Sequence, residues 1–269
     1  MLTKRLGILG ALALLPALVQ VSSRPVTPLA TTRISARQHA PMKFHRFRPD
    51  YSVESENWSG YAVTGSSFTQ AKGSWTVPTV YCSSTPNSYS SFWVGLDGYS
   101  STTVEQIGTD SDCNGKTPSY YAWYEFYPQG SYLINLTISP GNQISAQVSY
   151  SGNEFTVTIT NETTGKSFSK TTTVPGAKRS SAEWIAEAPC CTRGGGILPL
   201  SEFGTVSFGG DYTGVSGSND ATDAATSGAI GGFSSAQEIV MATSKGAEEA
   251  LPSAVSPDGS SFTVAWQSE

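Results

Sequence analysis

Apolar and polar positions alternate along most of the chain from residue 58 onward, which predicts β-strands. Every second residue of 144–150 is apolar, and the same holds for 155–159 after the turn residues Ser151-Gly-Asn153. Two such runs around a tight Gly-Asn turn predict a hairpin. The same alternation at 134–138 and 262–266 predicts two more strands, and Thr163-Thr-Gly165 predicts another turn.

Strand-like runs of this kind recur about a dozen times, and no run has the period of an amphipathic helix. Residues 212–235 are rich in Gly, Ser, Ala and Asp and predict a loop. Because no internal repeat or second domain is evident, we expect an all-β fold, a two-sheet antiparallel β-sandwich.

Charge is divided unevenly along the 269 residues. Residues 1–54 hold eight Lys and Arg against two Asp and Glu, whereas residues 55–269 hold eight against 19. An acidic body argues against nucleic acid as a partner, because phosphate binding needs a basic face. Both histidines, His39 and His45, lie in the basic part. Residues 55–269 therefore cannot supply a Ser-His-Asp or Cys-His centre or a histidine-rich zinc site, and no metal or cofactor is expected.

The N-terminus has the pattern of an export signal. Lys4 and Arg5 precede the apolar run 6–19, which is too short for a comfortable membrane span. We expect a signal peptide at 1–22, a basic segment at 23–54 and one domain at 55–269, with secretion and no membrane contact after cleavage. The basic segment is either a disordered linker or a pro-segment whose cations lie on the acidic body.

The four cysteines, an even number in an exported chain, suggest disulfides. They are Cys82, Cys113, Cys190 and Cys191, and three pairings are possible, including a strained vicinal bridge. No Cys-x-x-Cys spacing occurs, which argues against a zinc site.

An aromatic run at 119–128 is the first candidate for chemistry. As a strand it places Tyr121, Trp123, Glu125 and Tyr127 on one face, with the alternate residues facing the core. A carboxylate among rings suits a groove for a peptide or a sugar, although a hydrogen-bonded Glu on a half-buried face has the same pattern. Two other runs carry polar residues: 91–98 places Trp93, Gly95 and Asp97 on one side, and 182–187 places Glu183, Ile185 and Glu187 on one face.

Together these runs resemble the eqolisin, or glutamic peptidase, family of secreted acid endopeptidases. The matching blocks span residues 57–206 in the family's order: Asn57-Trp-Ser-Gly60, Val77-Pro78, Trp93-Val-Gly-Leu-Asp-Gly98, Gln106-Ile-Gly108, Ala122-Trp-Tyr-Glu-Phe-Tyr-Pro128, Ala182-Glu-Trp-Ile-Ala-Glu187 and Phe203-Gly-Thr-Val206. The resemblance implies a β-sandwich of the concanavalin or lectin-like jelly-roll architecture. It also favours the pro-segment, as an inhibitor removed from a zymogen.

The resemblance assigns a catalytic dyad to Gln106 and Glu187, not Glu183. A glutamate of near-ordinary pKa acting on water suits an acid working range without histidine. The positions that line or support the family's cleft are Trp58, Trp93, Asp97, Asp110, Glu125 and Tyr127. Departures from the family pattern are Tyr121, where an acidic residue is usual, Ala188-Pro189 after Glu187, and the absence of the cysteine that usually follows Asp97-Gly98.

The expected substrates are proteins and peptides, and the expected state is a monomer. The alternative is a carbohydrate-binding or glycoside-hydrolysing sandwich that uses Glu125 and Glu187 as paired carboxyl groups. It gives Gln106 no role. A pepsin-type enzyme would need an Asp-Thr-Gly or Asp-Ser-Gly triplet, and the sequence has none.

Overall fold

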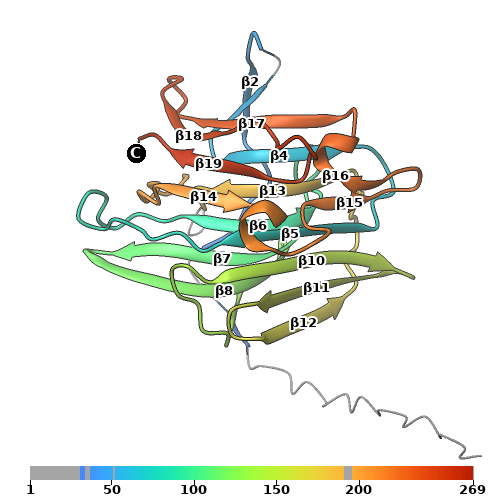
Figure 1. The fold of residues 1–269 in the computed structure, drawn as a ribbon, viewed down its shortest axis with the longest axis horizontal. Helices are drawn as coiled ribbons and strands as arrows, with labels where there is room; N and C mark the ends of the chain where they lie inside the picture. The colour runs from blue at the N-terminus through green and yellow to red at the C-terminus, as the bar shows by residue number, and fades with distance from the viewer. Residues whose placement is uncertain (1–30, 34–36, 51, 191–195, 269) are drawn as a thin grey trace, which may run out of the picture.

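Two β-sheets packed face to face form the body of the protein in a computed structural model, which describes residues 31–33, 37–50, 52–190 and 196–268. The predicted signal peptide and Cys191 lie outside the described residues. Both sheets run from top to bottom of Figure 1, one behind the other. The all-β sandwich prediction is confirmed.

The first sheet, here the site sheet, contains a run of eight antiparallel strands within the described part of the chain. In spatial order they are β17 (Ala236–Ala242), β4 (Trp58–Thr64), β13 (Ser181–Glu187), β6 (Ser91–Leu96), β7 (Val104–Asn114), β8 (Thr117–Tyr127), β9 (Tyr132–Ile134) and β1 (Thr31–Arg33). All neighbours in this order pair antiparallel, so the residues of adjacent strands stand in fixed register across the sheet.

The second sheet covers the inner face of the site sheet. Its strands are β12 (Lys166–Thr172), β11 (Glu154–Asn161), β10 (Gln143–Ser151), β5 (Gln70–Thr76), β14 (Thr205–Phe208), β19 (Phe262–Trp266) and β18 (Glu248–Pro252). β18 also pairs with β17, which joins the sheets along one edge. β5 and β10 pack against β6, and β11 packs against β7.

The remaining elements are short. β2 (Phe44–Phe47) and β3 (Val53–Ser55) form a hairpin that stands out at the top of Figure 1, and β3 pairs parallel to β17. β15 (Asp220–Thr222), β16 (Ser227–Ala229), the four-residue helix α1 (Gly210–Thr213) and the 3-10 turn η1 (Ile230–Gly232) complete the fold. No helix among the described residues is long and apolar enough to cross a membrane.

The predicted hairpin is confirmed. β10 and β11 pair from Ile144 to Ser151, and Gly152 in the connecting turn has a φ of 66°, which glycine adopts without strain. Two other predictions are partly wrong. β9 ends at Ile134 although Leu136 and Ile138 are buried, because the backbone beyond 134 joins no strand ladder. The predicted loop 212–235 contains the small β15–β16 hairpin.

Two apolar clusters follow from the strand alternation. The larger lies between the sheets and includes Trp75, Tyr124 and Trp184. The smaller lies on the outer face of the site sheet and contains three tryptophans, Trp58, Trp93 and Trp123. A sheet face that carries so many large rings must be covered, and residues 37–43 cover it with main-chain and side-chain contacts.

Candidate active site

The two predicted dyad residues lie on one face of the site sheet, Glu187 on β13 and Gln106 on β7, with β6 between these strands. Gln106 on β7 stands opposite Gly95 on β6 and Glu125 on β8. A Cβ atom at position 95 would lie 2.9 Å from the Trp93 ring and 3.3 Å from Cβ of Gln106. Glycine at this position therefore leaves the room in which both side chains fit.

Glu187, the last residue of β13, is fully buried on this face. Its Oε2 accepts the indole N–H of Trp93 at 2.9 Å and lies 3.2 Å from Nδ1 of His39. Burial, and then the negative charge of Glu125, raise the pKa of Glu187 well above its usual value. The sequence led us to expect a near-ordinary pKa for the working enzyme, whereas in this state the group is buried and in contact with His39.

Residues 37–43, here the docked segment, run across the site sheet like a bound peptide. Its central carbonyl, that of His39, accepts a hydrogen bond from Nε2 of Gln106 at 2.5 Å, and the His39 N–H donates to Oε2 of Glu125 at 2.8 Å. Gln38 pairs with the backbone of Cys190 through two hydrogen bonds of 2.8 and 3.0 Å. The main chain, which any peptide possesses, thus carries much of the contact.

The other half of the docked segment is held by the start of β4. The carbonyl of Ala40 accepts the indole N–H of Trp58 at 3.2 Å. The side-chain amide of Asn57 donates to the carbonyl oxygens of Ala40 and Pro41 at 3.4 and 3.3 Å. Trp58 packs edge-on against Trp93, with ring centroids 4.9 Å apart, so one aromatic pair contacts both the segment and Glu187.

The His39 side chain lies deepest in the site. Its ring stacks on Trp123 with centroids 3.4 Å apart and planes 2° apart, and it is fully buried. Burial, and then the positive charge of Arg37, lower the pKa of this imidazole well below its usual value. The absence of histidine from residues 55–269 stands, but the N-terminal part places one directly against Glu187.

An acidic pocket beside the dyad holds the guanidinium group of Arg37. This group contacts the carboxylate of Asp112 and the hydroxyl of Tyr121, and it lies 4.2 Å from the ring centroid of Tyr89. Tyr121 donates to Asp110 at 2.8 Å or to Asp112 at 2.7 Å. Burial raises the pKa of Asp110 to about 7 and that of Asp112 to about 6; the charge of Arg37 lowers both.

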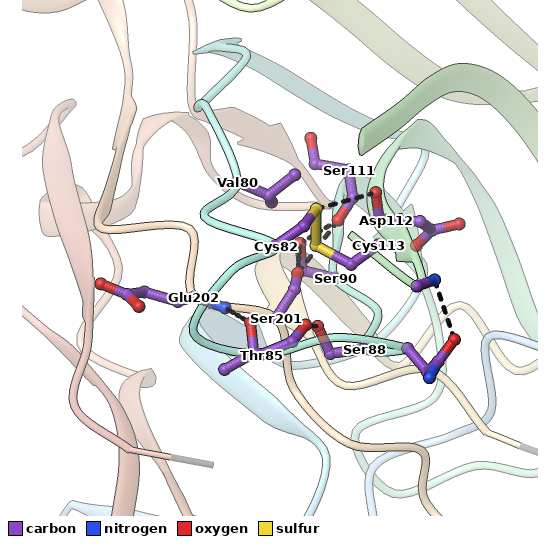
Figure 2. Close-up of a disulfide and its surroundings, with 12 residues drawn as sticks. Val80, Cys82, Thr85, Ser88, Ser90, Ser111, Asp112, Cys113, Ser201 and Glu202 are labelled. Atoms are coloured by element: carbon purple, nitrogen blue, oxygen red, sulfur yellow. Dashed lines mark hydrogen bonds between the residues drawn. A yellow bond between two sulfur atoms is a disulfide. The ribbon is translucent and has the colours of Figure 1, made fainter. Parts of the chain in front are cut away.

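A disulfide between Cys82 and Cys113 fixes the end of β7 that carries this pocket. Figure 2 shows it beside Asp112, whose carbonyl oxygen lies 3.9 Å from Sγ of Cys82. Around it, the hydroxyls of Ser90 and Ser201 both bond to the carbonyl oxygen of Ser111. One of the bridges that the four cysteines allow is therefore present, and it anchors the end of β7.

The predicted site residues fall into two groups. The docked segment is surrounded by Gln106, Glu187, Trp58, Glu125 and Asp110, the last of which lies near Arg37. Trp93 holds Glu187. Asp97 and Tyr127 lie at the margin. Asp97 follows β6, and its carboxylate accepts the backbone N–H groups of residues 178–180 at 2.7 to 2.9 Å, which ties down that loop. Tyr127, at the end of β8, packs on the smaller apolar cluster.

Several site residues were not predicted. Asp112 lies two positions after Asp110 on β7, so strand alternation could have placed it on the same face. Trp123 and Tyr121 were placed on this face without a role. His39 and Arg37 carried no local signal, because they reach the site across 148 and 75 residues of chain. Among the described residues, no group of three or more His, Cys, Asp and Glu could hold a metal ion.

Fold and site together define a β-sandwich whose outer sheet face holds residues 37–43 of its own chain between a buried glutamate and a glutamine. A family model described as the Peptidase A4 family matches residues 56–262. The chain belongs to this family, and the resemblance found in the motifs is confirmed.

Two relatives have similar sequences. Aspergillopepsin-2 of Aspergillus niger is 33% identical over 178 residues, which cover 57% of this chain and 62% of the relative. Scytalidopepsin B of Scytalidium lignicola is 32% identical over 176 residues, covering 63% of this chain and 65% of the relative. The chain thus spans slightly less than two thirds of the length of these curated relatives.

Solved structures match over more of the fold. Scytalido-glutamic peptidase, solved with a transition state analog inhibitor, has a TM-score of 0.66 and 26% identity, covering 79% of this chain and 98% of that one. Aspergilloglutamic peptidase from Aspergillus niger has a TM-score of 0.56 and 30% identity. The match covers 66% of this chain and 99% of that one.

Proposed function

We propose that this chain is a secreted acid endopeptidase that hydrolyses peptide bonds with Gln106 and Glu187. One observation carries the proposal: a peptide carbonyl, that of His39, lies 2.5 Å from the Gln106 amide while the same residue contacts Glu187. The relatives carry the names of peptidases, which supports the same reaction here.

In the proposed mechanism, Glu187 in its carboxylate form takes a proton from a water molecule as that water attacks the scissile carbonyl carbon. The Nε2–H of Gln106 donates to the oxyanion of the tetrahedral intermediate, a contribution that can reach about 3 kcal/mol for one well-placed donor. Glu187 then returns the proton to the leaving amine as the C–N bond breaks. Trp93 fixes the carboxyl group through its indole N–H.

Substitution of each dyad residue tests this mechanism. Gln106→Ala should abolish turnover of a denatured protein in acid while leaving the folded state intact, as measured by circular dichroism. Pepstatin, an inhibitor of aspartic peptidases, should have little effect because the site lacks a pair of catalytic aspartates. Retained activity in Gln106→Ala would contradict the mechanism.

Residues 23–54 act, in this proposal, as an inhibitory pro-segment. In this proposal the docked segment takes the place of a substrate, which is supported by the contact of the His39 ring with the carboxyl group of Glu187. Burial in this state raises the pKa of Glu187, which favours the protonated form that cannot act as a base. The arrangement explains how a segment with a substrate-like main chain can inhibit.

Two docked groups favour release of the pro-segment in acid. The charge of Arg37 lowers the pKa of Asp110 and Asp112, against the larger upward effect of burial, so protonation of either carboxylate weakens its attraction for Arg37. The buried imidazole of His39 also stays neutral, whereas a free imidazole binds a proton below about pH 6.5. Falling pH therefore favours the undocked state at both places. Glu125 and Glu187 oppose this, because burial under the segment raises their pKa.

Peptides and proteins are the proposed substrates, the pro-segment the proposed internal partner, and a monomer the proposed state. The sugar-directed alternative based on Glu125 and Glu187 is not favoured. In this structure both carboxyl groups contact one peptide residue, His39, through its main-chain N–H and its ring.

A further inference from the structure

Glu125 is the buried carboxyl group that joins the two halves of the site. It stands directly opposite Gln106 in the β7–β8 register, and its side chain is fully buried. Its Oε2 accepts the main-chain N–H of His39 at 2.8 Å and lies 3.4 Å from Nε2 of Gln106. One oxygen atom therefore contacts both the residue that supplies the carbonyl and the amide that binds this carbonyl.

This geometry constrains the Gln106 side chain. A glutamine amide can present either its N–H or its oxygen to a ligand, and only the N–H stabilises an oxyanion. Because Oε2 of Glu125 is an acceptor, it favours the orientation that turns Nε2, rather than Oε1, toward this side of the site. The same Nε2 then has its second hydrogen available for the His39 carbonyl.

We propose that Glu125 has two roles in the site. It binds the main-chain N–H of the residue on the acyl side of the cleaved bond, and it orients the Gln106 amide toward the carbonyl of that residue. This inference rests on the proposed function of the Gln106–Glu187 pair. It makes an acyl-side N–H a requirement of the site, whatever the side chain of that residue.

The protonated form of Glu125 can play this role in acid. Burial raises the pKa of Glu125 well above its usual value. A neutral carboxyl group still has a carbonyl oxygen that accepts hydrogen bonds. Glutamine at 125 would keep such an oxygen, whereas leucine would remove it at similar size, which provides a conservative and a disruptive variant.

The experiment uses the bond that the acid-incubated wild-type chain cleaves fastest in a denatured protein. Two peptides are made around this bond, one normal and one in which an ester oxygen replaces the N–H of the acyl-side residue. The scissile amide is the same in both, and product masses confirm where each is cut. The ester removes the donor without adding bulk, which an N-methyl group would do.

Wild type should cleave the ester peptide roughly 10- to 100-fold more slowly in kcat/KM, since a buried acceptor loses its partner. Glu125→Gln should keep the wild-type ratio of kcat/KM for the normal peptide to kcat/KM for the ester peptide. Glu125→Leu should lower kcat on the normal peptide and bring the ratio close to one. Glu183→Gln, at another fully buried carboxyl group of the site sheet, is the matched control and should keep the wild-type ratio.

Equal cleavage of the two peptides by wild type would overturn the inference even if Glu125→Leu does not fold. An unchanged ratio in folded Glu125→Leu would also overturn it. If wild type cleaves no bond in the denatured protein at any acid pH, the proposed peptidase function fails instead, which keeps the two failures distinguishable.

Discussion

A carboxyl group in the core makes the stability of the fold sensitive to pH. Glu105 on β7 stands opposite Leu96 and Phe126, two residues of the larger apolar cluster, and is fully buried. Burial, and then the negative charge of Asp97, raise the pKa of Glu105 to about 9 from an ordinary 4.5. The folded state therefore holds a proton that the unfolded chain releases.

The size of the effect follows from this difference. Between pH 4.5 and pH 7 the unfolded chain gives up the Glu105 proton and the folded chain keeps it, so folding is weakened by about 1.4 kcal/mol per pH unit. The loss reaches about 3 kcal/mol at pH 7, against a total stability of roughly 5–15 kcal/mol for a typical protein. Titration of Glu105 does not reduce the free energy of unfolding below about pH 4.5. Above that pH the free energy of unfolding falls, until the folded state also loses the proton near pH 9.

Glu105→Gln removes the titrating group and keeps the size of the protonated side chain. We expect variant and parent to unfold alike near pH 4, and the variant to be about 3 kcal/mol more stable at pH 7. Urea unfolding followed by tryptophan fluorescence measures this at pH 4, 5.5 and 7, in a Glu187→Gln background that prevents self-digestion. Glu154→Gln, at an exposed position of β11, controls for the loss of one negative charge.

Parallel curves of unfolding free energy against pH for the parent and Glu105→Gln would refute this reasoning. They would mean that Glu105 titrates alike in the folded and unfolded chains. Any constant offset between such parallel curves would measure a change in packing that does not depend on pH.

Three further predictions follow from the site. Arg37→Gln should weaken docking of the pro-segment by roughly 10- to 100-fold, because a hydrogen-bonded charge pair is lost; activity of the unprocessed chain should then begin at a higher pH than in wild type, and an unchanged onset would contradict the role of the acidic pocket. Replacing Cys82 and Cys113 by serine opens a link between residues 31 apart and should cost roughly 2–5 kcal/mol in chemical unfolding. After acid incubation, N-terminal sequencing should find a start near residues 50–57; a chain that still begins near Ser23 would argue against removal of the pro-segment.

Strand alternation predicted much of this molecule because each face of the site sheet meets a different environment. Tyr124 and Phe126 face the main core, whereas Trp123 lies in the outer cluster, as the pattern at 119–128 predicted. The register of β7 and β8, which the structure supplies, brings Gln106 opposite Glu125. Short elements such as β15 and β16 escaped prediction, since a few backbone pairs in a Gly-rich segment leave no periodic pattern.

Long-range contacts set the limit of prediction. The sequence predicted basic residues of the N-terminal segment lying on an acidic body, but not which side chain would meet which carboxylate. His39 belongs to the N-terminal part and was given no role in the site, yet its ring stacks on Trp123 at the centre of the site. Tyr121, placed on the site face and noted as a departure from the family pattern, contacts Asp110 and Asp112 by its hydroxyl group. Such contacts depend on tertiary packing, which no local pattern specifies.

The central claim is that Glu187 activates water for peptide hydrolysis. The most direct measurement is cleavage of a denatured protein from pH 2 to 7 by wild type and by Glu187→Gln after acid incubation, with folding checked in both. We expect cleavage by wild type confined to acid and no cleavage by the folded variant. Cleavage by Glu187→Gln at the wild-type rate, or a folded and processed wild type without activity, would contradict the claim.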